Sequence, residues 1–169
     1  YSMASANLPW GDMSYEKLSS EYVLHPLMTA VSTLTVNNGS DTYTFDIGTK
    51  ETATTNDDGE ESTTTTTSVM YGDSEINSSY FSTFFQNLTL LKKSDTSSDK
   101  PSGKAVFTAE YKYTDGSTDT VKFYDADGNK YLAEVNGISV GHLYKTNPSK
   151  LIEQVKTVAN NKEVSDFAI

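Results

Sequence analysis

The chain has 169 residues and a net charge of −10, from 13 lysines, no arginine and 23 carboxylates. It has no cysteine, which excludes disulfides, thiolate metal sites and cysteine catalysis. The acidic, arginine-free composition argues against binding to nucleic acid or to an anionic membrane surface, since both require a positively charged patch.

Residues 1–26 are predicted to form an N-terminal extension. Ser14 is a suitable N-cap for a short helix, which Pro26 should end because the residue before a proline avoids the α region. The apolar stripe of that helix would be Tyr15, Leu18 and Tyr22. The chain begins with Tyr1 and not Met, and we interpret it as a trimmed or processed piece.

Residues 27–93 are predicted to form a first unit of strand, turn, strand, turn, strand and helix. Alternating side chains over 31–36 and 42–47 indicate two strands, which the Asn-Gly turn at 37–40 separates. A third strand should run to Gly72. The helix that follows should begin after Asn77 or Ser78 and bury one stripe: Phe81, Phe84, Phe85, Leu88 and Leu91.

The threonine-rich stretch 51–68 has two competing interpretations. One is a disordered or O-glycosylated linker. The other is a long hairpin that folds back at Asp58-Gly59, since threonine favours strands. We favour the hairpin, because it supplies the third strand of the unit.

Residues 94–103 are polar, contain Pro101 and Gly103, and are predicted to be a linker. Residues 104–169 should then repeat the order of the first unit. Their strands would turn at Asp115-Gly116 and at 125–129, and a short fourth strand would cover 140–144. The last helix should be capped by Asn147 and bury Leu151, Ile152, Val155 and Val158.

The expected fold is therefore α+β. Two β-β-β-α repeats would form antiparallel sheets, each with a helix packed on one face. The regular pattern ends at about residue 160, and the remaining residues are predicted to form a C-terminal tail.

The segment from Tyr113 to Gly137 resembles a bacterial family, the domain of unknown function 4340 family. It contains Tyr-Thr-Asp-Gly-Ser-Thr from Tyr113 and Tyr-Leu-Ala-Glu-Val-Asn-Gly from Tyr131, and the helix led by Asn147 follows. The hairpin from Leu34 to Phe45 is similar to the opening hairpin of that family. The resemblance covers roughly residues 27–160 and implies an extracytoplasmic domain tethered to the cell membrane, with relatives often encoded beside ABC transporter components. It implies no catalytic residues.

Three groups of side chains are candidate sites. Asp125, Asp127, Asn129 and Glu134 are faintly similar to a calcium loop, but the glycine comes fourth and strands flank the turn, so a hairpin turn is favoured. A site built on His25 and His142 has no neighbouring residues to complete it. Trp10 and the 11 tyrosines would suit sugar stacking, although strand-face packing is the favoured interpretation.

These observations predict a non-enzymatic extracytoplasmic interaction module of a bacterial envelope protein. The partner would be an envelope protein or an ABC transporter subunit, and the alternative is a carbohydrate- or peptidoglycan-binding surface. No hydrolase, phosphate-loop or metalloprotease motif is present in the sequence. We therefore predict no catalytic residue, no metal and no cofactor. No apolar run approaches the ~20 residues that span a bilayer.

Overall fold

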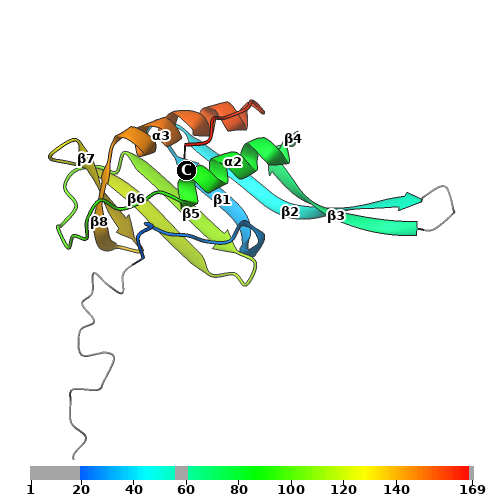
Figure 1. Ribbon diagram of the computed structural model, residues 1–169, viewed down its shortest axis with the longest axis horizontal. Coiled ribbons are helices and arrows are strands. Elements are labelled where there is room, and N and C mark those ends of the chain that lie inside the picture. Colours follow the sequence, from blue (N-terminus) through cyan, green and yellow to red (C-terminus); the bar gives the residue numbers. More distant parts are fainter. Residues whose placement is uncertain (1–19, 56–60, 168–169) are drawn as a thin grey trace, which may run out of the picture.

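A computed structural model describes residues 20–55 and 61–167 of the chain. It contains one eight-stranded antiparallel sheet with the strand order β4-β3-β2-β1-β5-β6-β7-β8. Two helices lie on one face of this sheet (Figure 1), which confirms the α+β class. The elements are η2 (Met28–Ala30), β1 (Val31–Asn37), β2 (Thr42–Thr55), β3 (Glu61–Tyr71), β4 (Ser74–Ile76), α2 (Ser78–Thr89), β5 (Phe107–Tyr113), β6 (Thr118–Ala126), β7 (Lys130–Val135), β8 (Ile138–Tyr144) and α3 (Thr146–Ala159).

The strands form one continuous sheet where the sequence suggested separate sheets. β1 and β5 pair antiparallel, with Leu34 opposite Tyr111 and Val36 opposite Ala109. All four side chains are buried, because cross-strand partners point to the same face and that face lies under the helices. The first strands of the two halves thus join both sets of strands around one core.

Each helix is preceded by four strands, as the sequence predicts for the second half but not for the first. Gly72 and Gly137 both have positive φ and turn the chain into a further strand, whereas after Gly72 the sequence predicts the helix directly. Strand β8, which the sequence predicts over 140–144, begins at Ile138. Strand β4 was not predicted, since three residues are too few to show a period of two.

The predicted helices are confirmed, with one difference at a cap. Asn77 is the N-cap of α2, and its side chain accepts a hydrogen bond from the Ser79 backbone N–H at 2.9 Å. The whole predicted stripe from Phe81 to Leu91 is buried. Helix α3 starts two residues earlier than expected, with Lys145 and not Asn147 at its N-cap. Its buried face includes Leu151, Val155 and Val158 as predicted, whereas Ile152 is only half-buried.

Residues 20–25 do not form the end of a helix, contrary to the prediction. Tyr22 bridges Lys92, and the Val23 N–H donates to the Leu91 carbonyl at 3.0 Å. Backbone pairing across the end of α2 therefore replaces the helical bonds there. The rest of the predicted helix and Trp10 lie outside the described residues. No helix in the part of the chain that the structure describes is both long and apolar enough to cross a membrane.

The threonine-rich stretch forms a hairpin, so the favoured interpretation is confirmed. β2 and β3 pair continuously from Phe45 opposite Tyr71 to Thr55 opposite Glu61. Residues 56–60, which include the predicted Asp58-Gly59 turn, lie outside the described residues. The outer part of the hairpin, residues 48–55 and 61–68, projects away from the body of the domain (Figure 1). We call it the arm.

The arm is expected to be dispensable for folding. Its described side chains at 49–53 and 63–66 are exposed, so they bury little apolar surface against the body. Replacing residues 52–64 with Asn-Gly, a turn that matches the twist of a hairpin, should leave the melting temperature nearly unchanged. Thermal unfolding followed by circular dichroism checks this, and a loss of the folded signal would show that the arm is integral to the sheet.

Candidate functional site

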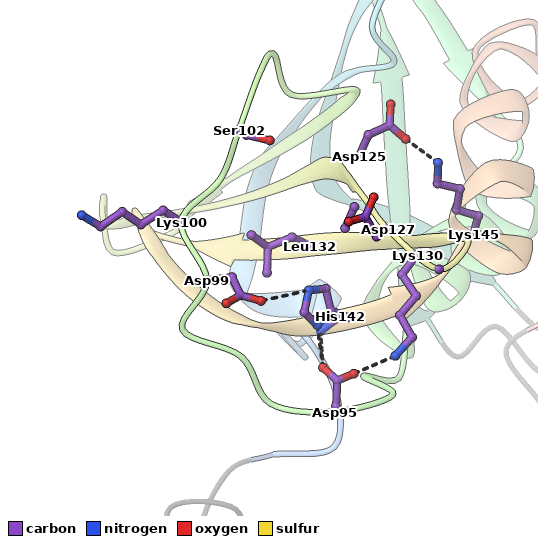
Figure 2. Close-up of a pocket in the computed structure, with 12 residues that line it drawn as sticks. Asp95, Asp99, Lys100, Ser102, Asp125, Asp127, Lys130, Leu132, His142 and Lys145 are labelled. Atoms are coloured by element: carbon purple, nitrogen blue, oxygen red, sulfur yellow. Dashed lines mark hydrogen bonds and ion pairs between the residues drawn. The ribbon is translucent and has the colours of Figure 1, made fainter.

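A polar hollow lies beside the second half of the sheet. Its volume is about 800 Å³, and it separates the segment 94–103 from the tip of the β6–β7 hairpin (Figure 2). Asp95, Asp99 and Lys100 enter it from the segment. Residues of the hairpin and of β8 face them, together with the N-cap residue of α3: Asp125, Asp127, Lys130, His142 and Lys145.

Sheet register explains why these side chains meet. Leu132 lies opposite His142 and Lys130 lies opposite Tyr144, so Lys130 and His142 share the helix-free face. The segment 94–103 reaches that face because residues 94 and 95 pair with the edge of β8. The Ser94 N–H donates to the His142 carbonyl at 2.7 Å, and Asp95 and His142 form an antiparallel bridge.

Gly141 permits the close approach of the segment. A Cβ at this position would collide with the backbone carbonyl of Asp95, and the φ of +151° is one that other residues rarely adopt. The segment predicted to be a linker is therefore held against the sheet by a backbone contact that only glycine allows.

Asp95 is the centre of an ion-pair cluster. Its Oδ1 lies 2.8 Å from His142 Nδ1, and its Oδ2 accepts a hydrogen bond from Lys130 Nζ at 2.8 Å. The His142 backbone N–H also donates to Oδ1 at 3.1 Å. On the other side of the ring, His142 Nε2 lies 3.6 Å from Asp99 Oδ2. The imidazole is thus placed between two carboxylates (Figure 2).

The pKa of Asp95 reflects two opposing effects. Burial raises this pKa. The hydrogen bonds from Lys130 and His142 lower it by more, so the pKa is about 2 against an ordinary value of 3.8. The carboxylate therefore stays ionised throughout the physiological range. Its charge stabilises the docked segment above its ordinary pKa, and this stabilisation is lost as the pH falls through about 2.

We expect an Asp95→Asn variant to show this dependence. Its melting temperature should lie below that of the wild type by a constant amount near neutral pH. The difference should shrink between about pH 4 and pH 2, as wild-type Asp95 becomes protonated. A pH series of thermal melts measures it, with Asp99→Asn as the control because that carboxylate is 72% exposed. A difference that persists unchanged at pH 2 would contradict the assignment.

The cluster of Asp95, Lys130 and His142 holds the segment 94–103 against β8, and we call it the clamp. Each imidazole nitrogen of His142 faces a carboxylate, so neither is directed at a hydroxyl that it could activate. Ser94 Oγ donates to the His142 carbonyl at 3.1 Å, which directs this hydroxyl away from the ring nitrogens. The geometry supports fixation of the segment 94–103 against the sheet.

The residues considered as a calcium loop do not converge. Lys145 Nζ forms a short ion pair with Asp125 and lies over the Tyr131 ring. Glu134 is on β7, with Lys122 Nζ at 3.8 Å. Within residues 20–55 and 61–167, no group of three or more histidines and carboxylates is arranged to hold a metal ion. The turn residues Gly128 and Asn129 have positive φ, as a tight hairpin requires.

Residues that carry the family resemblance have structural roles. The Tyr113 hydroxyl donates to Asp119 Oδ2 at 2.7 Å, and Asn136 Nδ2 donates to Asp119 Oδ1 at the same distance. Burial and this bond to Asp119 raise the pKa of Tyr113. Asp115 accepts bonds from the backbone and hydroxyl of Ser117 and so closes its own turn. The motif therefore encodes two turns and the contact between them.

The remaining sequence candidates are dispersed. His25 packs against the Tyr22 ring with centroids 5.2 Å apart, in a different setting from His142. Among the tyrosines that the structure describes, only Tyr144 is largely exposed, at 60%. Asp95, Asp99 and Lys130 were not identified from the sequence, because their surroundings have the composition of an ordinary linker and hairpin turn.

Comparisons with known proteins return no relative. No protein-family model matches the chain, and neither a curated protein nor a solved structure does.

Proposed function

We propose that this chain is a non-enzymatic interaction module that acts outside the cytoplasmic membrane of a bacterium, and that its arm contacts a protein partner. The observation that carries the proposal is the arm itself. Two strands continue in register for eleven paired positions, and most of that length lies beyond the helices that cover the rest of the sheet (Figure 1).

A projecting two-stranded ribbon of this kind contributes little to the free energy of folding of the domain. An isolated two-stranded hairpin is marginal in water, because backbone pairing alone must offset the entropy of ordering it. Packing on the body does not compensate, since the described arm side chains at 49–53 and 63–66 are exposed. Such an element is suited to contact with another molecule, as protruding loops on rigid scaffolds often are.

The proposed location and partner rest on the family resemblance. It implies an extracytoplasmic domain, tethered to the cell membrane by a segment outside this sequence, and a partner among envelope proteins or ABC transporter subunits. The clamp around His142 supports the non-enzymatic part of the proposal, because it places carboxylates at both ring nitrogens. The carbohydrate alternative has weaker support, since the described residues present Tyr144 without a cluster of exposed rings.

In vivo cross-linking tests the proposal. The full-length protein would be expressed in its own host beside the variant in which Asn-Gly replaces residues 52–64, and intact cells would be cross-linked. The proposal predicts capture of an envelope protein by the wild type and its loss in the variant. Capture that is unchanged in the variant would assign the contact to the body. Recovery of glycan alone, or turnover of a polysaccharide panel by the purified chain, would favour the alternatives.

We also propose, as the sequence predicted, that the two halves are copies of one unit. Two features support this. Each half runs through four strands and one helix, and the strand order is mirrored about the β1–β5 pair. The duplication would explain why both helices lie on the same face of one sheet.

A further inference from the structure

The edge of β2 that faces β1 becomes unpaired where the two strands separate. β1 pairs with β2 from Asn37 opposite Thr42 to Thr33 opposite Asp46, and no described strand continues that pairing. β2 itself extends to Thr55. The backbone of residues 47–55 therefore presents an unpaired edge of the kind to which another strand adds.

A small, mainly apolar hollow lies at the base of this edge. Its volume is about 190 Å³, and Met28, Val31, Ile47 and Gly48 are among the residues that line it. Leu27, next to Met28 in the chain, is 69% exposed. A strand added to the β2 edge would pass this hollow, so one of its side chains would have an apolar place to dock. Backbone pairing combined with a side-chain pocket is the recognition mode of strand addition.

Gly48 is not required by the chain's own structure. A Cβ at this position would meet nothing within 4 Å, and its φ lies outside the left-handed region. A glycine in a strand often marks a place where another backbone or ligand approaches closely. Since no described atom lies within 4 Å of that Cβ position, the strand face beside Gly48 is open to a separate molecule.

Charge indicates the chemistry of that molecule. Residues 46–61 carry six carboxylates and one lysine, and the whole chain has a net charge of −10. A second copy of this chain would be repelled, whereas a basic segment would be attracted and guided to the arm.

We propose that an extended, basic segment of a partner protein adds as a strand to the β2 edge at residues 47–55 and places one apolar side chain between Met28, Val31 and Ile47. This inference rests on the proposed function and specifies its partner and binding mode. In the added strand, every second backbone N–H would point toward β2 and donate a hydrogen bond to it, and the N–H groups between them would face solvent.

The experiment uses a random dodecapeptide library as the probe. The library would be selected on the intact chain and counter-selected on the variant with Asn-Gly in place of residues 52–64. Enriched peptides should lack proline and combine β-branched residues, lysine or arginine and an apolar residue. Methylation of one alternate set of amide nitrogens in the best peptide should abolish binding, whereas methylation of the other set should preserve it. Absence of arm-dependent peptides, or equal tolerance of both methylated sets, would overturn the inference.

Two variants test the hollow with that peptide. Thr49→Leu enlarges a side chain that lines the hollow on the same face as Ile47, and should weaken binding about tenfold or more, which corresponds to ~1.4 kcal/mol. The matched control Thr64→Leu adds the same side chain to an exposed position of β3 outside the hollow and should bind as the wild type does. Thr29→Trp blocks the same hollow from a second exposed position and replaces Thr49→Leu if that variant fails to fold. Wild-type affinity in a folded hollow variant would overturn the inference.

The two proposals fail separately. A photo-cross-linking residue at Thr49 on β2, compared with one at Glu153 on α3, would be used in the host. Cross-links from Thr49 to a basic segment of an envelope protein support both proposals. If capture depends on the arm but Thr49 yields no cross-link, strand addition at β2 is contradicted and the proposed function is not. Loss of all envelope capture contradicts the proposed function as well.

Discussion

Replacing Phe84 with alanine is expected to lower the free energy of unfolding by about 3–5 kcal/mol, as truncation of a fully buried phenylalanine does. Phe84 is 0% exposed. Its ring centroid lies 6.3 Å from those of both Phe45 on β2 and Phe81 on α2. The alanine would leave a cavity between helix and sheet that these neighbouring rings fill only in part. A domain of this size has about 5–15 kcal/mol of stability in total.

Denaturant unfolding at constant temperature measures this effect. Phe84→Leu should be milder than Phe84→Ala, because leucine retains most of the buried volume. Tyr144→Ala is the matched surface control, since that ring is 60% exposed, and it should change stability little. A shift of Phe84→Ala no larger than that of Tyr144→Ala would mean that α2 is not packed as described.

Replacing Asn87 with leucine should destabilise the protein by about 1–3 kcal/mol for each buried polar group left without its partner. Asn87 is 0% exposed on α2. Its Nδ2 donates to Gln154 Oε1 and to the Ser165 carbonyl, both at 2.9 Å. Its Oδ1 accepts from the Phe167 N–H at 3.1 Å. One amide thus joins α2, α3 and the segment after α3, and leucine would break all three bonds.

A double-mutant cycle separates this network from simple packing. Asn87→Leu and Gln154→Leu together should be less destabilising than the sum of the two single changes, because the double variant leaves no orphaned amide of the pair. Thr83→Ala on the same helix is the control, since its exposed hydroxyl bonds only locally to the Ser79 carbonyl. Strict additivity of the two changes would argue against direct coupling between Asn87 and Gln154.

The sequence alone determined the local elements, because each has a local cause. Alternation of apolar side chains over 31–36 and 42–47 specified strands and the face that they bury. Turn residues such as Asp115-Gly116 placed the hairpins, and the stripe from Phe81 to Leu91 specified a helix with one buried side. These patterns were sufficient for the α+β class and for most of the core.

The tertiary structure alone decided which elements meet. Pairing of β1 with β5 joins residues about 75 positions apart, and a local pattern does not specify the partner of a free edge. The same holds for Asp95, whose place beside Lys130 and His142 depends on the segment 94–103 docking against Gly141. Asn87 has the appearance of an ordinary polar residue on a helix until α3 brings Gln154 to it. The unpaired β2 edge likewise follows only from the three-dimensional structure, because it begins where the pairing between β1 and β2 ends.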